Sequence, residues 1–499
     1  MSHIFQNVTF MTLCVTEKCN ATCTYCYIPA KYTHDPLQTK DMMSQKTVEQ
    51  VVDSVFLNKS GEKRFITLQF HGGEPSLLGI DWYRQAIPIL RNTARTNNVE
   101  LKLKMQSNFI AMSDEFAQFL KENNIEVNIS LDGPPEIHDK MRSGGEASVA
   151  NLKRYVEITG DHPGLIAVIG QHNYDKIDLL LHYFYNELGL TSANFQWVQA
   201  IGRGRERHCL TPEGQINGAI KVINFMNETN GDFTETYTKR FVRMYFDPEF
   251  RIADRGSRAC EGFYCMAWNG MVSVSSQGEV IGCDTLLGDK ALRGLFIDEY
   301  YTNKDSFIAK YNAKKRCCHS KSEWWARCES CEARAICDFG CPSEYHTTDY
   351  GKEGDEKHCD FIIGVYNYIK QHEKSLSHLY HLFVSKDQEI TKSQIEGAVR
   401  YVENIADNER KKRLREVIAQ DLESNFSKKY RLGRLNDLLN DLHNERLEVI
   451  LQNNDIILAN AQDKHFVVLK KMDELYEVDE LTFERMKQGE KLYKHLINE

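Results

Sequence analysis

The sequence predicts an α/β fold built on a parallel sheet, followed by a cysteine-rich segment and a helical tail. From residue 8 to about 230, short β-rich runs alternate with longer amphipathic runs, and the pattern strand, helix, strand repeats six times. Such a repeat is typical of parallel strands joined by crossover helices. Six units fit an open barrel as well as a doubly wound sheet.

The expected strands are bounded by helices with clear periodicity. We expect strands at 8–16, 65–71, 100–108, 126–133, 165–173 and 192–200. Between them, runs such as SQKTVEQVVDSVFLNK and SDEFAQFLKEN carry apolar residues at helical spacing after a Ser that can cap the helix. Because parallel sheets build their sites at strand ends, we expect functional residues there.

Three domains are predicted, at residues 1–230, 231–375 and 376–499. The second is irregular and rich in cysteine, with one hairpin turning at Ser275 to Gly278. The third has helical periodicity, in runs at 393–422 and 432–454, and contains neither Pro nor Cys. It is therefore expected to be a helical extension.

Composition excludes several classes of protein. A formal net charge of −9 gives no global attraction to nucleic acid. The N-terminus lacks signal-peptide features and no window approaches 18 consecutive apolar residues, so we expect a cytoplasmic protein without a membrane partner. Fifteen cysteines in a reducing compartment indicate metal ligation or redox chemistry rather than disulfides.

Three cysteines stand close together after the first strand, as C-x3-C-x2-C: Cys19, Cys23 and Cys26. A 4Fe-4S cluster that only carries electrons needs four ligands, so three leave one iron open to a small molecule. A zinc site is the alternative, with Cys14 as the fourth ligand. With Tyr25 and Tyr27, the triplet resembles the radical S-adenosylmethionine (SAM) superfamily. The resemblance implies that the open iron chelates SAM and that an electron from the cluster cleaves it to a 5'-deoxyadenosyl radical.

Motifs at the next strand ends extend this resemblance. Paired glycines in HGGEP (71–75) let the backbone approach a ligand, and Glu74 can accept from an ammonium group. QSN (106–108) and SLDGPPEIHDKMR (130–142) follow. The resemblance implies a partial (β/α)6 TIM barrel in which the GGE element holds the SAM amino group, and Ser130 and Arg142 contact its ribose and carboxylate. The residues expected to bind SAM are Tyr25, His71, Gly72, Gly73, Glu74, Ser107, Asn108, Ser130 and Arg142. An ordinary turn and a surface arginine are the alternatives.

A second cysteine field has a characteristic spacing. It reads Cys265-x12-Gly278-x4-Cys283, then Cys328-x2-Cys331-x5-Cys337-x3-Cys341, then Cys359. This order resembles the SPASM domain, which binds auxiliary 4Fe-4S clusters; two zinc ribbons are the alternative. The resemblance implies one cluster on Cys260, Cys265, Cys283 and Cys341 and another on Cys328, Cys331, Cys337 and Cys359, three clusters in all. Cys260 lies outside the pattern, Cys14 and Cys209 are expected to be structural thiols, and Cys317 and Cys318 have no assigned partner.

Asp284 directly follows an expected cluster ligand, in GCDT. In the anaerobic sulfatase-maturating enzymes, which these motifs resemble, an aspartate here is the proposed base that takes a proton when a Cys or Ser radical becomes an aldehyde. A carboxylate kept from water has a raised pKa suited to that role. An Asp that only starts a turn is the alternative.

Three functions remain open. The first is an oxidoreductase that matures a ribosomally made peptide or a protein, reduced by flavodoxin or ferredoxin, and installs an oxidised residue or a thioether or carbon–carbon crosslink. The second is a sulfatase maturase that forms formylglycine, favoured by SLDGP and Asp284 but not by the long tail. The third is a non-catalytic iron–sulfur scaffold or electron-transfer partner, which the intact Glu74, Ser130 and Arg142 disfavour. A barrel short by two units would leave an open side for an extended client, and the tail would offer further client-binding surface.

Overall fold

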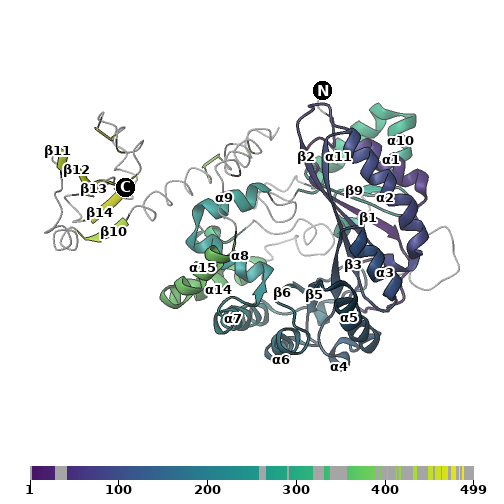
Figure 1. The fold of residues 1–499 in the computed structure, drawn as a ribbon, viewed down its shortest axis with the longest axis horizontal. Helices are drawn as coiled ribbons and strands as arrows, with labels where there is room; N and C mark the ends of the chain where they lie inside the picture. Colours follow the sequence, from purple (N-terminus) through teal and green to yellow (C-terminus); the bar gives the residue numbers. More distant parts are fainter. Residues whose placement is uncertain are drawn as a thin grey trace. The chain divides into compact units, whose positions relative to one another are not determined.

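The computed structural model describes residues 3–28, 42–257, 266–288, 292–318, 331–337 and 357–387, and beyond residue 387 five strands and a few single positions (Figure 1). Its contacts divide the chain into two compact units. The first comprises Met1–Phe246 with Arg258–Glu389, and the second comprises Asp247–Ser257 with Ile390–Glu499.

The first unit is built on a nine-stranded sheet in the order β7-β6-β5-β4-β3-β2-β1-β8-β9. Its first seven strands in the chain are β1 (Phe10–Thr16), β2 (Arg64–Gly72), β3 (Val99–Ser107), β4 (Ile125–Ser130), β5 (Gly164–Ile169), β6 (Ser192–Trp197) and β7 (Thr234–Glu235). From β1 to β7, each strand pairs in parallel with the next one along the chain. A doubly wound sheet reverses its order at a switch point, and this run does not, so the expected partial barrel is confirmed.

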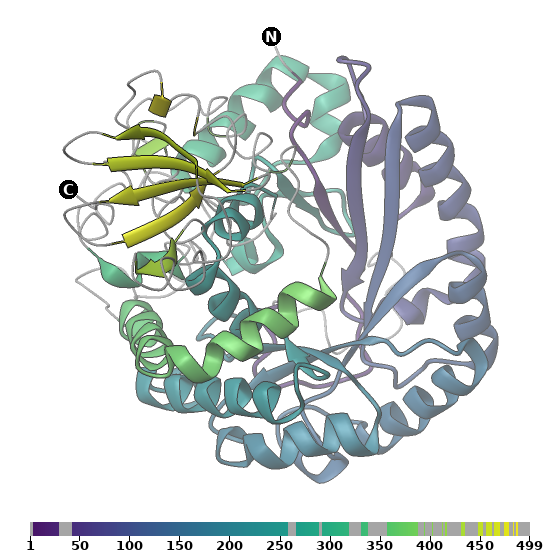
Figure 2. The same cartoon turned by 60° about the vertical axis from the view of Figure 1, so that its left-hand side comes forward.

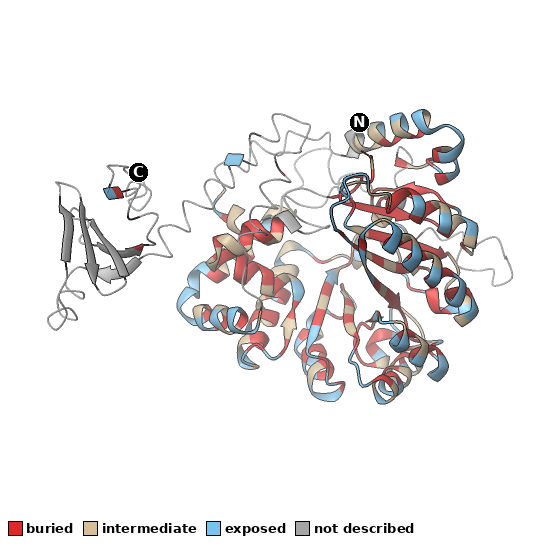
Figure 3. Ribbon diagram, turned by 45° about the horizontal axis from the view of Figure 1, so that its top comes forward, coloured by how far each residue is buried: buried red, intermediate tan, exposed pale blue. Residues whose placement is uncertain are grey.

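Helices follow the strands and cover the outer side of the sheet (Figure 1). The main ones are α1 (Gln45–Val55), α2 (Gly79–Thr96), α3 (Asp114–Glu122), α5 (Gly145–Thr159), α6 (Ile177–His182) and α7 (Pro212–Glu228). The expected Ser caps are present, since Ser44 Oγ accepts from Thr47 N at 3.1 Å and Ser113 Oγ accepts from Phe116 N at 3.2 Å. Each helix turns its buried residues toward the strands and its exposed ones away (Figure 3).

Several short helices shape the strand ends. They are η3 (Pro75–Leu78), α4 (Pro135–His138), η4 (Tyr174–Lys176), the π-helical turn η5 (Tyr183–Glu187), η6 (Glu206–His208), η7 (Asp284–Gly288) and η10 (Glu332–Ala335). Most of them begin within a few residues of a strand end, which brings polar side chains close to the sheet.

The expected hairpin forms from β8 (Met271–Val274) and β9 (Val280–Ile281), which pair antiparallel. Gly278 has φ of 79°, and its N–H donates to Ser275 O at 2.9 Å, which closes the turn. The sequence did not predict that β8 also pairs in parallel with β1. The hairpin therefore extends the barrel sheet past β1 rather than forming a separate sheet.

Further helices complete the first unit. They are α8 (Thr236–Phe246), α10 (Ile297–Thr302), α11 (Lys304–Cys318), α14 (Lys357–Gln371) and α15 (Glu373–Lys386). Asp387, just past α15, pairs with Lys239 and Arg243 of α8 at 2.7 Å each. Tyr368 of α14 donates to Asn224 Oδ1 of α7 at 2.6 Å. These contacts are consistent with the assignment of α14, α15 and Asp387 to the first unit.

The second unit contains α9 (Pro248–Ser257) and a five-stranded antiparallel sheet in the order β10-β14-β13-β12-β11 (Figure 2). Its strands are β10 (Arg431–Arg434), β11 (Glu448–Gln452), β12 (Ile456–Ala461), β13 (Lys464–Leu469) and β14 (Glu474–Val478). The prediction of a helical extension is wrong here, because the short apolar runs around EVILQ, DIILA and HFVVL are rich in β-branched residues and pair with one another. Most of the run at 393–422 lies outside the described residues.

No helix in the described part of the chain is both long and apolar enough to cross a membrane.

Candidate active site

The loop after β1 brings the cysteine triplet together. Cys19, Cys23 and Cys26 gather around buried Ala21 and Tyr25. Burial raises the pKa of Cys19 to about 12, with further increases from Glu74 and the other two thiols, and burial also raises the pKa of Cys23. Without a metal, these buried thiols tend to stay protonated. They suit an iron–sulfur site, because positively charged iron stabilises the thiolates that form as the protons leave.

A single zinc ion suits these residues less well. Among the described residues, no three His, Cys, Asp or Glu side chains converge closely enough to hold one metal ion. Cys14, the proposed fourth zinc ligand, is buried on β1, where Asp284 and Glu17 rather than the triplet act on its thiol. A cluster spanning the three thiols therefore fits the donor set better than one zinc ion does.

Asp132 organises the side of the triplet next to β4. It is fully buried, and Tyr25 Oη donates to its Oδ2 while Arg142 Nε donates to the same oxygen at 3.0 Å. Burial pushes the pKa of Asp132 up, but Arg142 and the hydrogen bonds outweigh it and hold that pKa below its usual range. The Arg142 side chain reaches Cys23, with Nη1 at 3.9 Å from Sγ, so it is not an ordinary surface arginine.

Glu74 ties the end of β2 to the end of β3. Its carboxylate accepts from Ser107 Oγ at 2.8 Å and Asn108 N at 2.7 Å, and also from Ser76 N at 3.0 Å. Burial raises the pKa of Glu74, and these hydrogen bonds partly offset that rise. The carboxylate thus has a structural task, and a contact with a SAM amino group stays a prediction.

The paired glycines let two stretches of backbone come together. A Cβ on Gly72 would lie 2.1 Å from Thr16 O, and one on Gly73 would lie 2.1 Å from Lys18 O. Gly73 N donates to Thr16 O at 2.8 Å. The HGGEP segment therefore packs against the start of the triplet loop and fixes its position.

The ends of β3 and β4 carry a linked polar row. Asn108 Nδ2 donates to Asn20 Oδ1 at 2.7 Å, which joins β3 to the triplet loop. Gln106 Nε2 donates to Ser130 Oγ at 2.7 Å, and Gln106 Oε1 is buried without a hydrogen-bond partner. These residues reach the barrel face where the triplet lies, as expected, although Gln106 itself was not predicted.

Asp284 contacts Tyr27, the residue after Cys26, although it is more than 250 residues away in the chain. Tyr27 Oη donates to Asp284 Oδ2 at 2.5 Å, and the Tyr27 and His71 rings are 6.4 Å apart. Burial lowers the pKa of His71, and Asp284 acts in the opposite direction. Nδ1 of His71 is buried without a hydrogen-bond partner. The fold thus gathers an acid, a phenol and an imidazole next to Cys26.

The second cysteine field is described in part. Cys283 precedes η7 with Sγ at 3.1 Å from Thr285 Oγ1, Cys331 and Cys337 flank η10, and Cys359 is on α14. Cys317 and Cys318 end α11. The other expected ligands lie outside the described residues, namely Cys260, Cys265, Cys328 and Cys341. The assignment to two auxiliary clusters stays a prediction.

Two site features escaped the sequence analysis. His172, past the end of β5, stacks on Tyr25 with ring centroids 6.0 Å apart. The loop after β6 touches the triplet loop, since Arg203 N donates to Cys26 O at 2.8 Å. Cys209, at the end of that loop, is half-buried against the same cluster of side chains. Arg203 follows the expected strand 192–200, whereas His172 falls within the expected strand 165–173, which ends earlier at Ile169.

Comparison with known proteins agrees with this geometry. Residues 13–184 match the family model described as the Radical SAM superfamily. The chain therefore contains a radical SAM domain. It is related to the anaerobic sulfatase-maturating enzymes, with 27% identity over 350 residues to the cysteine-type enzyme of Clostridium novyi (strain NT), which covers 65% of this chain and 85% of the relative.

Two further matches belong to the same group. The serine-type enzyme of Bacteroides thetaiotaomicron is 25% identical over 232 residues, which cover 45% of this chain and 55% of the relative. A solved structure described as native anSMEcpe with bound AdoMet and Cp18Cys peptide has a TM-score of 0.59 at 19% identity, and the match covers 75% of this chain and 99% of that one. That likeness concerns the fold.

Proposed function

We propose that this chain is a radical SAM maturase that oxidises a Cys or Ser side chain of a peptide or protein client to an aldehyde. The observation that carries the proposal is the hydrogen bond of Asp284 with Tyr27, the residue that follows Cys26 and lies near His71. The related sulfatase-maturating enzymes support this choice of reaction.

The residues fit the cofactors that such a reaction needs. Cys19, Cys23 and Cys26 would hold a 4Fe-4S cluster, which would supply the electron for the reductive cleavage of SAM. Asp132 orients Tyr25 and Arg142 at Cys23. Asp284 takes the proton that the client's hydroxyl or thiol loses as it becomes an aldehyde or a thioaldehyde. In the thioaldehyde, water then replaces the sulfur, which leaves as hydrogen sulfide.

The second candidate is crosslinking of a ribosomally made peptide through a thioether or carbon–carbon bond. It is favoured by the five-stranded sheet of the second unit, which lies in a tail that departs from the compact sulfatase-maturating pattern. The same site residues serve both reactions, because each begins by removing a hydrogen atom from a client side chain.

Other parts of the proposal concern the whole chain. We assign residues 1–230 to the barrel and 231–375 to a SPASM domain with two auxiliary 4Fe-4S clusters that accept the client's remaining electron. The reductant is a flavodoxin or ferredoxin, the location is cytoplasmic, and no nucleic acid takes part.

Anaerobic reconstitution followed by iron analysis and turnover tests the proposal. Three clusters give about twelve irons per chain, whereas about four irons would indicate a single cluster, on the triplet only. With dithionite, SAM and a peptide spanning the modified Cys of a sulfatase, mass spectrometry should find 5'-deoxyadenosine and an aldehyde. Loss of two hydrogens without an aldehyde would support crosslinking, and no 5'-deoxyadenosine at all would favour the iron–sulfur scaffold.

A further inference from the structure

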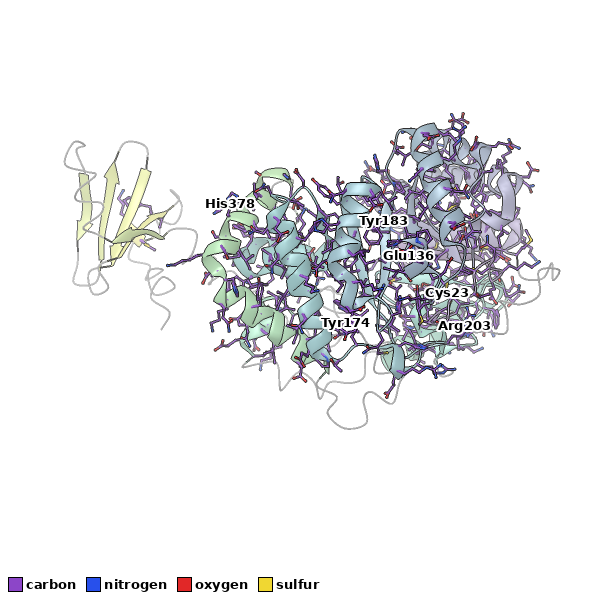
Figure 4. All side chains as sticks on the ribbon, turned by 90° about the horizontal axis from the view of Figure 1, so that it is seen from below. Cys23, Glu136, Tyr174, Tyr183, Arg203 and His378 are labelled. Carbon is purple, nitrogen blue, oxygen red and sulfur yellow. The ribbon has the colours of Figure 1, made fainter. Side chains whose placement is uncertain are left out.

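The loop between β6 and α7 lies directly on the triplet loop. Gly202 has φ of 59°, and a Cβ there would come 2.5 Å from Tyr27 Cα, so the two backbones touch. At its other end the loop is held by Gln171 N, which donates to His208 O at 3.0 Å. The Arg203 charge reaches Cys23 and lowers its pKa against the rise from burial. Figure 4 shows Arg203 and Cys23 close together.

This loop concentrates positive charge. Its sequence RGRERH places three arginines and a histidine in six residues with a single acid, in a chain of net charge −9. Arg205 and Arg207 are exposed. Arg205 Nη1 donates to the carbonyls of Gly202 and Gly204 at 3.0 and 2.9 Å, and Arg207 Nε donates to His208 Nε2 at 3.2 Å.

None of these arginines forms an ion pair with another described residue, whereas the exposed Arg84 and Arg154 each pair with two carboxylates. Because no acid in the described part of the chain pairs with these arginines, the loop keeps a net positive potential. The pKa of His208 is lowered by burial and then by Arg207, His172 and Arg205, as expected where positive charges gather.

Two buried groups beside the loop have unused hydrogen-bonding capacity. Arg203 Nε is buried without a hydrogen-bond partner among the described residues. The His172 side chain is 6% exposed, and neither ring nitrogen has a hydrogen bond within the described part of the chain, although Nε2 lies 3.8 Å from Asp132 Oδ2. Buried donors that the chain leaves unsatisfied cost free energy, so an anionic acceptor from outside stabilises them.

We propose that residues 203–208 bind an acidic segment of the client peptide, with its carboxylates on Arg203, Arg205 and Arg207. The inference rests on the proposed function and specifies that the preferred client is negatively charged near the modified residue. Binding there would place a neighbouring client residue next to the triplet, since Arg203 is hydrogen-bonded to Cys26. A peptide suits this patch better than a nucleic acid, because three arginines in an acidic chain do not form the extended basic surface that phosphate backbones need.

Fluorescence anisotropy with the reconstituted full chain tests the proposal. The probes are labelled Gly–Ser peptides that carry several glutamates, or glutamines or lysines at the same positions. We expect the glutamate peptide to bind about tenfold more tightly than the glutamine peptide at low salt, and this preference to disappear at high salt.

Charge reversal then locates the site. The double variant Arg205→Glu/Arg207→Glu should remove the preference for glutamate, whereas Arg205→Lys/Arg207→Lys should keep most of it because the charge is unchanged. The matched control is Arg91→Glu/Arg95→Glu, two exposed arginines of α2 without acidic partners among the described residues. This control should keep the full preference.

Three results would overturn the inference: equal affinity for the glutamate and glutamine peptides, loss of the preference in the α2 control, or tighter binding of a single-stranded oligonucleotide than of the glutamate peptide. Binding is measured without turnover. A chain that binds the acidic peptide but forms no 5'-deoxyadenosine would therefore refute the proposed function and not this inference.

Discussion

Asp132 joins three elements of the candidate site at the side next to Cys23. It accepts from Tyr25, from Arg142 and, through Oδ1, from Val168 N at 2.9 Å. The carboxylate is therefore ionised, and it fixes a ring and a guanidinium next to Cys23. Neither its burial nor its partners can be read from the motif SLDGP, in which it looks like a turn residue.

The variant Asp132→Asn should be strongly destabilising. It leaves Arg142, whose side chain is 11% exposed, without its anion, and breaking a buried pair costs about 3–5 kcal/mol. Asp114→Asn is the control, because its partner Arg154 is exposed and solvent screens such pairs, so the loss should be much smaller. Anaerobic urea unfolding of the reconstituted chain measures both, and equal losses would contradict the assignment.

Tyr27 is predicted to act through Asp284. The variant Tyr27→Phe removes the phenol that holds Asp284 Oδ2, so proton removal from the client should slow while SAM cleavage continues. We expect the ratio of modified peptide to 5'-deoxyadenosine to fall about tenfold, less than the full effect of losing a general base. Tyr368→Phe is the control, since it loses a similar hydrogen bond on α14 and should leave the ratio unchanged.

At the scale of elements, the end of β2 controls the position of the triplet loop. A Cβ on Gly72 would collide with Thr16 O, which is backbone and has no free space to move. Gly72→Ala should therefore displace the loop and reduce the iron content by about four per chain while other clusters remain. Gly79→Ala is the matched control, because Gly79 also has positive φ but meets nothing within 4 Å. A full iron content in Gly72→Ala would contradict this role.

The elements show what local sequence can and cannot predict. The six parallel strands and their helices were predictable because each has a clear period and several have Ser caps. The pairing of β8 with β1 was not predictable, since the paired residues Leu13 and Val274 are more than 250 residues apart in the sequence. In the tail, the leucines of LGRLNDLLNDL have helical spacing and led to the prediction of a helix. The run EVILQ that follows contains β-branched residues and forms β11. Cysteine spacing is local and pointed to the triplet, whereas the contact of Tyr27 with Asp284 depends on the whole fold.

At the scale of the whole molecule, the two units divide the expected tasks. The triplet, Asp132 and Asp284 all belong to the first unit, and so does the contact of Asp387 with α8. Among the described strands of the second unit, β10 and β11 are the two edges of the sheet. Such edge strands offer unpaired backbone groups to an extended peptide.

Removing residues 390–499 should therefore separate the two tasks. We expect the truncated chain to keep its iron content and its SAM cleavage within about twofold, because these depend on the first unit. Its affinity for client peptides should fall equally for acidic and neutral sequences, since strand addition uses backbone hydrogen bonds and is largely independent of side-chain charge. The charge reversal at Arg205 and Arg207 should instead lower the affinity for acidic peptides only. Anisotropy titrations of both variants at low and high salt distinguish these patterns, and unchanged client affinity after truncation would remove the second unit from client binding.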